Sequence, residues 1–417
     1  MPRLLACTLL LCDCTLTASA GDWPQWLGPH RDGSTSEIVA PWKGKLEVVW
    51  QHPIGEGNSS PVVAEGRVFF HAKVKDKTEE EVVAYDAKSG KQLWRTAYPR
   101  AEFQSLYGNG PRGTPAVVDG KVYTFGITGV LTCFEAASGK IIWQVDTLKD
   151  FNAPKLFFGM AGSPLVEGDK VLVNVGAPGA SIVAFDRNTG KVVWKTRDDK
   201  ASYSSPIAFG EGKMRQVIFL TARGLVSLNP ADGSTWWEFP LVDRLLESST
   251  TPVHAGDMLV GSSITYGSAG LHLETKDAKP AYKQEWTNKE LTCYFSTPVA
   301  VGKDQLYMVT GKLPNPLAPR TPPAATLHCV EAKTGKILWS RPKVGEYHAS
   351  LLRTGDDKLL MLEEFGDLVL LQPDAKEYKE LARTKVCGKT WAHPALANGL
   401  LYLRDEKDVL CVRLEAK

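Results

Sequence analysis

A stretch of eleven residues recurs five times in this chain of 417 residues. In each copy a small residue is followed two positions later by an acid or amide, glycine stands at the seventh position, and tryptophan stands at the eleventh. The copies are AYDAKSGKQLW (84–94), CFEAASGKIIW (133–143), AFDRNTGKVVW (184–194), SLNPADGSTWW (227–237) and CVEAKTGKILW (329–339). Such self-similarity restricts the chain to an architecture built from similar units.

A second marker, a proline preceded by Ser, Thr or His, gives the number of units. It occurs at Pro61, Pro115, Pro164, Pro206, Pro252, Pro298 and Pro394. The last gap is about twice the others, and Leu351 stands in the vacant position, so the chain contains eight repeats of about 48 residues. A glycine turn and short apolar runs follow each marker, which indicates four strands per repeat.

Four strands in forty to fifty residues are typical of a β-propeller blade. We therefore predict an all-β, eight-bladed propeller of four-stranded antiparallel blades; no 3.6-residue apolar period supports a helical solenoid. The last repeat ends before a fourth strand, whereas LEVVWQHP (46–53) carries Trp50 eleven residues before Pro61. We expect this N-terminal strand to pair with the C-terminal blade and to close the ring, which removes open sheet edges.

The polar residues of AFDRNTGKVVW have structural explanations. Asp186 can accept hydrogen bonds from backbone N–H groups of the following turn, Gly190 supplies a conformation that a Cβ resists, and Lys191 is a solvated turn residue. Trp194 should fill the wedge between blades, a burial of about 4–6 kcal/mol before opposing terms. The blade-packing tryptophans are Trp50, Trp94, Trp143, Trp194, Trp237, Trp286 and Trp339, and by spacing the seventh repeat has Ala382 instead.

The N-terminus has the pattern of an export signal. Arg3 gives a positive start, residues 4–12 an apolar core, and Ala18-Ser19-Ala20 a cleavage site. We therefore predict a signal peptide at 1–20, a lead-in segment at 21–45 and one propeller domain at 46–417. The mature protein should be soluble in the periplasm or cell envelope. Retention there and release from the cell remain alternatives.

Charge and cysteine content exclude several classes of partner. The formal net charge is +2, without long runs of either sign, which argues against nucleic acid. No stretch of 18 apolar residues predicts a transmembrane helix. Signal cleavage would leave five cysteines, an odd set that is a poor disulfide framework, and Cys133, Cys329 and Cys411 occupy the small-residue position of the repeat. We expect a monomer with no metal site.

The repeat AxDxxTGKxxW resembles the pyrroloquinoline-quinone (PQQ) repeat of quinoprotein alcohol dehydrogenases and of BamB-like outer-membrane assembly factors. DWPQWLGPHRDG (22–33) and YGNGPRGTP (107–115) are similar to segments of exported PQQ-like propellers of planctomycete-type bacteria. The resemblance covers about 42–414 and implies an eight-bladed propeller, in agreement with the count of repeats. It is specific for fold and weak for function, because the motif packs blades.

The candidate binding residues lie in the loops just before each Ser-Pro marker, which should converge around the central channel. These polar and aromatic side chains are Glu56, Asn58, Tyr107, Asn109, Arg112, Tyr203, Glu247, Tyr294, Tyr347, His348, Trp391 and His393. Together they could form a funnel for a small polar ligand or a peptide. The alternative is that they only solvate the channel mouth.

No sequence motif assigns a catalytic residue or a cofactor. The resemblance to quinoprotein dehydrogenases implies PQQ, a Ca²⁺ site, an aspartate base, an arginine on the quinone and a stacking tryptophan. Arg112, Glu56 or Glu247, Asn58 or Asn109, and Trp391 are the residues available for such roles, and the chain has no adjacent cysteine pair. The first hypothesis is a non-catalytic binding or scaffolding module of the cell envelope; the alternative is a PQQ- and Ca²⁺-dependent dehydrogenase of an alcohol or sugar.

Overall fold

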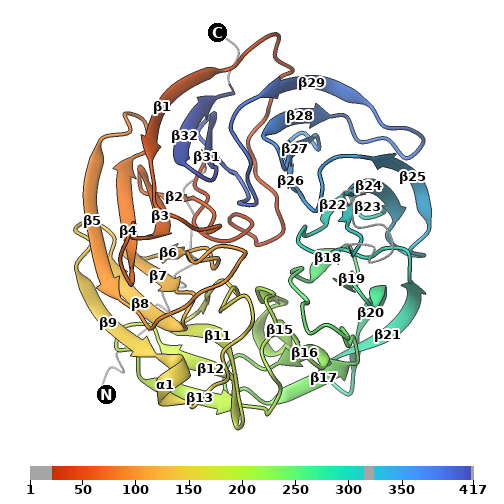
Figure 1. Cartoon of the computed structure of the whole chain (residues 1–417). Helices are drawn as coiled ribbons and strands as arrows, with labels where there is room; N and C mark the ends of the chain where they lie inside the picture. The colour runs from red at the N-terminus through yellow and green to blue at the C-terminus, as the bar shows by residue number, and fades with distance from the viewer. Residues whose placement is uncertain (1–20, 314–323, 415–417) are drawn as a thin grey trace, which may run out of the picture.

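The computed structural model describes residues 21–313 and 324–414. Eight four-stranded antiparallel sheets surround a central axis (Figure 1). The predicted propeller is confirmed, and the predicted signal peptide lies outside the described residues. Two short helices, α1 (Thr147–Asp150) and the 3-10 helix η1 (Gly212–Met214), are the helices of the described part of the chain.

Each blade is built outward from an axial strand. In seven blades the innermost strand begins directly after the marker proline. The innermost strands are β2 (Val62–Ala64), β6 (Ala116–Val118), β10 (Leu165–Glu167), β14 (Ile207–Phe209), β18 (Val253–Ala255), β22 (Val299–Val301), β26 (Ala349–Arg353) and β30 (Ala395–Ala397). The second strands are β3 (Arg67–Lys73), β7 (Lys121–Phe125), β11 (Lys170–Ala177), β15 (Gln216–Thr221), β19 (Met258–Ser263), β23 (Gln305–Thr310), β27 (Leu359–Glu363) and β31 (Leu400–Arg404).

The outer half of each blade carries the repeated stretch. The third strands are β4 (Glu79–Asp86), β8 (Val130–Glu135), β12 (Ala180–Asp186), β16 (Gly224–Leu228), β20 (Gly267–Lys276), β24 (Thr326–Glu331), β28 (Asp367–Leu371) and β32 (Asp408–Arg413). The fourth strands are β5 (Gln92–Pro99), β9 (Ile141–Asp146), β13 (Val192–Thr196), β17 (Thr235–Phe239), β21 (Lys279–Asn288), β25 (Ile337–Pro342) and β29 (Glu380–Lys385), with β1 (Glu47–Pro53) in the eighth blade.

The ring closes as the sequence predicted. β1 pairs antiparallel with β32, and Trp50 lies opposite Cys411 in this register. The eighth blade therefore takes three strands from the C-terminal end and one from the N-terminal end.

The tryptophan of one blade and the glycine of the next form the joint between blades. Trp143 donates its indole N–H to the carbonyl of Arg187, 3.1 Å away in the third blade. A Cβ at Gly190 would lie 2.7 Å from the Trp143 ring, and Gly190 has φ +70°. Glycine is thus required both for its left-handed backbone and for the approach of the indole. The same indole-to-carbonyl bond joins Trp50 to Ala87, Trp94 to Ala136, Trp194 to Pro230, Trp286 to Ala332 and Trp339 to Asp374.

The turn residues of AFDRNTGKVVW have the structural role expected of them. Asp186 accepts hydrogen bonds from the backbone N–H groups of Asn188 and Thr189 and from the Thr189 hydroxyl. These bonds are the first cause of its lowered pKa, since they favour the ionised carboxylate. Lys191 is exposed. The stretch is a blade turn.

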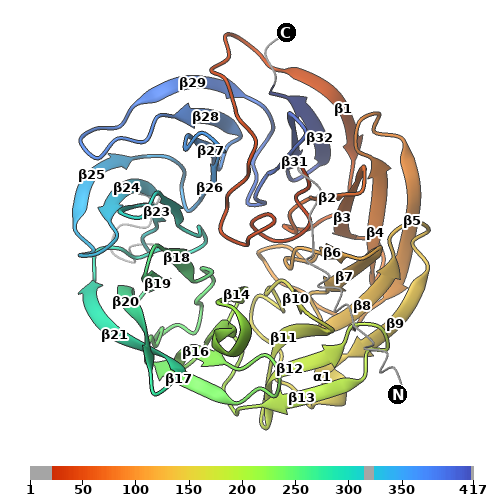
Figure 2. The ribbon, with the colours of Figure 1, turned by 180° about the vertical axis from the view of Figure 1, so that it is seen from behind.

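The seventh blade has Ala382 at the position of the tryptophan, and its neighbour has no turn between its third and fourth strands. The eighth blade obtains its fourth strand from the other end of the chain, so no turn follows β32 to present a carbonyl. The chain that leads into β1 instead passes outward between these two blades (Figures 1 and 2). Its Trp42 is 9% exposed and belongs to the same apolar cluster as Ala382.

The hydroxyl of the Ser-Pro marker links neighbouring blades around the axis. In five places the marker residue donates its backbone N–H to the marker hydroxyl of the following blade. These bonds run from His393 to Ser60, Ser60 to Thr114, Thr114 to Ser163, Ser163 to Ser205 and Thr251 to Thr297. The marker is therefore a fastening between blades, a role that its spacing did not reveal.

Residues 21–45 enter the channel from one end of the axis. Arg31 is 4% exposed and donates to the carbonyls of Pro206 and Pro164, at 2.8 and 3.0 Å. Trp26 donates its indole N–H to Thr251 at 2.8 Å. Seen from behind, this segment crosses the central opening (Figure 2). The segment expected to lead into the propeller thus also fills its axis.

Replacement of Trp194 by alanine should lower the free energy of unfolding by about 3–5 kcal/mol. The change leaves a cavity between two blades and removes the bond to the Pro230 carbonyl. Urea unfolding measures the loss. Val193→Ala is the matched control, because Val193 is 47% exposed on the same strand and should change stability by less than about 1 kcal/mol. Equal losses for both variants would contradict the wedge role.

Candidate functional site

The predicted site loops and the repeated turns lie at opposite faces of the propeller. Each axial strand runs from the loop that precedes its marker to a turn at the other end. The repeated turn bonds to that second turn, as in the bonds from Ala87 to Gly66 and from Arg187 to Asp169. We call the other face, where the site loops meet, the mouth. Any chemistry of the mouth is therefore separate from the motif that builds the blades.

On the side of the first two blades, polar groups fasten the mouth loops to one another. Glu56 accepts the backbone N–H of Asn109 at 3.0 Å, and Asn58 donates its backbone N–H to Pro111. A Cβ at Gly110 would lie 1.9 Å from the Glu56 carbonyl oxygen. The second glycine of YGNGPRGTP is thus required by the close approach of two loops.

Arg112 donates hydrogen bonds to main-chain carbonyls. Its Nε donates to Phe158 at 2.9 Å, and its Nη2 donates to Tyr107 and Gly108 at 2.9 and 3.2 Å. Burial lowers its pKa. The guanidinium therefore cross-links two loops of the mouth wall.

The opposite wall contains a stack of aromatic rings. Tyr294 lies on Phe295 with ring centroids 3.8 Å apart, and Phe295 lies on Trp391 at 4.9 Å. Tyr347 contacts Trp391 edge-on at 6.1 Å. The Tyr294 hydroxyl donates to Glu247, and burial together with this carboxylate raises the Tyr294 pKa. Phe295 was absent from the sequence predictions, although it lies in the same loop as Tyr294.

A carboxylate that the sequence analysis missed holds this wall in place. Glu364 is buried, accepts the Trp391 indole N–H at 2.8 Å, and accepts the backbone N–H groups of Glu346 and Tyr347. Lys389 lies 3.4 Å from the same carboxylate. Because Glu364 precedes a turn within a blade rather than a marker, its place in the repeat gave no signal.

Tyr107 and Tyr203 both contact Phe158 and are not part of the aromatic stack. Tyr107 is 52% exposed and contacts Phe158 edge-on at 5.3 Å. Tyr203 is buried, contacts the same Phe158 ring, and accepts the Phe158 backbone N–H at its hydroxyl. Burial is the main cause of the raised Tyr203 pKa, with Glu247 adding to it.

His348 and His393 lie below the mouth, inside the channel. Their ring centroids are 5.6 Å apart, so the expected approach of the two loops is found. His348 is hydrogen-bonded on both ring nitrogens, to Ser296 at 3.0 Å and to Ser350 at 2.9 Å. Burial lowers the pKa of His348 to about 4 and also lowers the pKa of His393 well below its usual value. Both rings are therefore neutral near pH 7.

A cavity of about 450 Å³ opens at the mouth between the eighth, first and second blades. Four predicted residues line it, namely Glu56, Asn58, Tyr107 and Trp391. The other lining residues are Gly57, Leu106, Gly108, Gly110, Lys389, Thr390, Ala392, Arg404, Asp405 and Glu406. The remaining predicted site residues build the surrounding walls or lie beneath the cavity.

Arg404 is the most deeply placed charge of this cavity. It is 2% exposed and donates to the carbonyls of His71 and Gly55, the first at 2.6 Å. Burial lowers its pKa to about 10, so it keeps its charge at neutral pH. Its role resembles that of Arg112, because both guanidinium groups are committed to main-chain oxygens.

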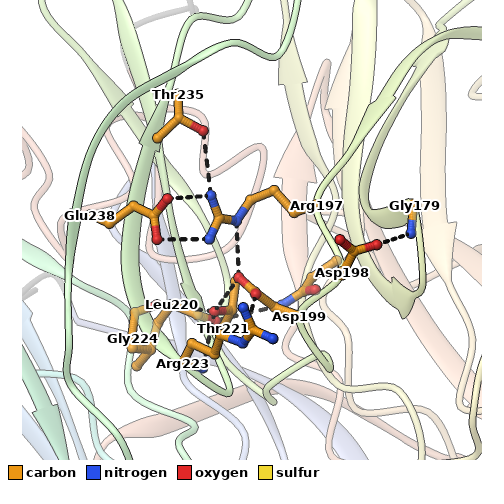
Figure 3. A network of polar contacts seen from close by, with 11 residues as sticks. Gly179, Arg197, Asp198, Asp199, Leu220, Thr221, Arg223, Gly224, Thr235 and Glu238 are labelled. Atoms are coloured by element: carbon orange, nitrogen blue, oxygen red, sulfur yellow. Dashed lines mark hydrogen bonds and ion pairs between the residues drawn. The ribbon is translucent and has the colours of Figure 1, made fainter.

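A buried acid outside the mouth has a structural explanation. Asp199 accepts hydrogen bonds from Arg197 at 2.9 Å and from Thr221 at 3.1 Å, and Arg223 lies 3.3 Å away (Figure 3). Arg197 also forms a bidentate pair with Glu238 at 2.8 and 2.9 Å. The network joins the third and fourth blades. Its carboxylates already have partners, and we assign it to blade packing.

The residues available for PQQ and Ca²⁺ do not form the site that a quinoprotein requires. The Nε and Nη2 atoms of Arg112 donate to carbonyls, and Glu247 accepts the Tyr294 hydroxyl. Among the described residues, no three His, Cys, Asp or Glu side chains lie where they could hold one metal ion. The donor set thus fits the cofactor poorly.

Two further observations concern the cysteines and the helices of the described part of the chain. Cys133, Cys293, Cys329, Cys387 and Cys411 are free and buried. In the same part no helix is long and apolar enough to cross a membrane.

Comparison with known protein families shows to which family the chain belongs. The family model described as outer membrane protein assembly factor BamB matches residues 39–97 and 78–341. The chain belongs to this family. Its PQQ-like propeller agrees with the fold, and the matched region includes the first six blades and β1, but not the seventh blade or the other strands of the eighth.

BamB-family relatives cover much of the chain. The outer membrane protein assembly factor BamB of Burkholderia pseudomallei is 22% identical over 316 residues, which are 72% of this chain and 70% of that protein. The crystal structure of BamB from Moraxella catarrhalis superposes with a TM-score of 0.57 at 16% identity, over 88% of this chain and 99% of that one.

Dehydrogenases share the fold as well. A quinohemoprotein alcohol dehydrogenase of Pseudomonas putida is 26% identical over 207 residues, 47% of this chain. The match spans about a quarter of that enzyme's length (27%). The quinohemoprotein alcohol dehydrogenase of Comamonas testosteroni superposes with a TM-score of 0.61 at 15% identity, over 96% of this chain and 82% of that one. The proteins to which the chain is similar thus include both assembly factors and dehydrogenases.

Because His348 and His393 are buried, we predict that the stability of the protein depends on pH. The unfolded chain binds a proton at His348 near pH 6.5, whereas the folded chain does so near pH 4. The free energy of unfolding should therefore fall as pH decreases from about 6.5 to about 4, by about 3 kcal/mol for this group. Urea unfolding between pH 4.5 and pH 8 measures the slope, to which His393 adds.

His348→Asn should make that slope shallower. The comparison at pH 8, where both histidines are neutral in either state, isolates the effect of altered hydrogen bonds to Ser296 and Ser350. An unchanged slope in the variant would show that His348 is not a source of the pH dependence.

Proposed function

We propose that this BamB-family propeller is an exported binding or scaffolding module of the cell envelope, without catalysis of its own. Its ligand would be a small polar molecule or a peptide, or a segment of an envelope protein, held at the mouth. The observation that carries this proposal is the cavity of about 450 Å³ between mouth loops of three neighbouring blades. A cavity of this size, with aromatic and polar walls, suits a small ligand.

The commitments of the mouth side chains favour binding over oxidation. A hydride or proton acceptor must reach substrate, but His348 has both ring nitrogens hydrogen-bonded inside the channel. Arg112 and Arg404 hold loops through their carbonyls, and Glu364 holds the aromatic wall. Rigid walls of this kind pre-organise a site, which lowers the entropic cost of binding.

Export to the envelope is part of the same proposal. The N-terminal pattern of Arg3, the apolar run at 4–12 and Ala18-Ser19-Ala20 supports it at the level of sequence. The relative from Burkholderia pseudomallei is an outer membrane assembly factor by name, which agrees with an envelope location.

A PQQ- and Ca²⁺-dependent dehydrogenase is the second candidate. The quinohemoprotein alcohol dehydrogenases among the relatives favour it, although the match covers a small part of their length. PQQ itself is a tricarboxylic acid, and the acidic side chains Glu56, Asp405 and Glu406 line the cavity. Like charges in the cavity wall oppose an anionic cofactor.

Titration with PQQ and Ca²⁺ separates the two candidates. We expect no saturable quenching of tryptophan fluorescence by the cofactor and no dye reduction with alcohols or sugars. The measurement uses the mature chain, with a quinoprotein dehydrogenase as the positive control. Saturable binding accompanied by turnover would replace the binding-module proposal with the enzyme.

A further inference from the structure

The chemistry of the cavity indicates the class of ligand, an inference that rests on the proposed binding function. Two aromatic side chains, Tyr107 and Trp391, belong to its wall and come from different blades. Tyr107 is half exposed, and Trp391 is backed by Phe295. One ring face of Trp391 is thus covered by protein, and the indole is fixed by its bond to Glu364.

The charges around these rings are mainly negative. Glu56, Asp405 and Glu406 line the cavity together with Lys389 and Arg404. Lys389 lies 3.4 Å from Glu364 and 3.9 Å from Glu346, two further carboxylates. Three carboxylates and two cations therefore line the cavity, and two further carboxylates lie beside Lys389.

The two cations are not placed to hold an anionic ligand. The ammonium of Lys389 is balanced by its two carboxylate neighbours. Arg404 donates to the carbonyls of His71 and Gly55 and is almost fully buried. Neither Glu56 nor Glu406 forms an ion pair within the described part of the chain, and Glu56 accepts the Asn109 backbone N–H.

The tyrosines of the mouth experience this negative field. Burial and the carboxylates of Glu346 and Glu364 raise the pKa of Tyr347, and Tyr107 adds to the effect. Tyr107 contributes in the same direction to the raised pKa of Tyr294. The phenol groups of three blades therefore lie close enough to interact across the mouth.

We propose that the mouth cavity binds a small organic cation of the alkylammonium type, held between the rings of Tyr107 and Trp391 and neutralised by Glu56 and Glu406. Aromatic faces attract such cations, and their methyl groups bury against the rings without a need for hydrogen bonds. Nearby carboxylates increase this attraction in a site sheltered from water.

Choline and its neutral isostere 3,3-dimethylbutan-1-ol provide a test that isolates the charge. The two molecules have nearly the same shape, and only choline is a cation. Calorimetric titration of the mature chain should give saturable binding of choline and binding of the alcohol that is at least about tenfold weaker. Equal affinities, or no saturable binding of choline up to about 10 mM, would overturn the inference.

Substitutions of cavity residues test whether choline binds at this cavity. Tyr107→Leu and Glu56→Gln should each weaken choline binding by about three- to tenfold. Glu274→Gln is the matched control for charge, because Glu274 is exposed in the outer part of the fifth blade. Tyr107 is half exposed, so its replacement should leave the fold intact, and thermal unfolding verifies this. Equal affinity in all variants would move the site elsewhere and contradict the proposal.

Vesicles of phosphatidylcholine present the same trimethylammonium group on a lipid. Cosedimentation that excess choline and Tyr107→Leu abolish would identify a lipid headgroup as the source of the cation. Binding of free choline without cosedimentation would identify a soluble cation. Binding of the alcohol as tightly as choline would leave the binding function standing and remove only the requirement for charge, whereas turnover with PQQ would remove the binding-module function itself.

Discussion

The contact of a tryptophan with the glycine turn of the next blade is the interaction on which the ring depends. The indole fills the wedge between two sheets and ends in a hydrogen bond, as for Trp143 and Arg187. The facing glycine leaves room for the ring, since a Cβ at Gly190 would lie 2.7 Å from it. Repetition of this joint sets the spacing of the blades and hence the width of the channel.

Two joints differ from this pattern. Trp237 donates its indole N–H to Gln216 of its own blade, and the joint between the seventh and eighth blades is shaped by the closure of the ring. The eighth blade takes its outer strand from the N-terminal end, so no turn is available to accept an indole N–H from the seventh blade. Ala382 stands in the tryptophan position, and Trp42 from the incoming chain packs in the same apolar cluster. The segment before β1 therefore packs between these blades, and its Arg31 fills the axis.

Buried charged side chains hold together the loops that form the wall of the mouth. Arg112, Arg404 and Glu364 all bond to the main chain of neighbouring loops, which holds those loops at fixed separations. Aromatic rings and carboxylates are prominent among the groups that line the cavity, together with Lys389. The charges that face the cavity thus differ in balance from the mixture of acidic and basic residues in the sequence of its loops.

The sequence by itself determined the number of blades, the closing strand and the structural nature of AFDRNTGKVVW. These properties repeat along the chain, so each copy supports the others. It also named four residues that line the cavity, because the marker proline locates the loops at the mouth.

Only the tertiary structure decided which mouth residues face a ligand space. Arg112 appeared suited to a cofactor, but it donates to two carbonyls of its own loop and to Phe158, and the Phe158 contact exists only because loops of two blades meet. Glu364 and Arg404 gave no sequence signal, because their partners lie in other segments of the chain. A repeat encodes contacts that recur in every blade, whereas the mouth is made of contacts that occur once.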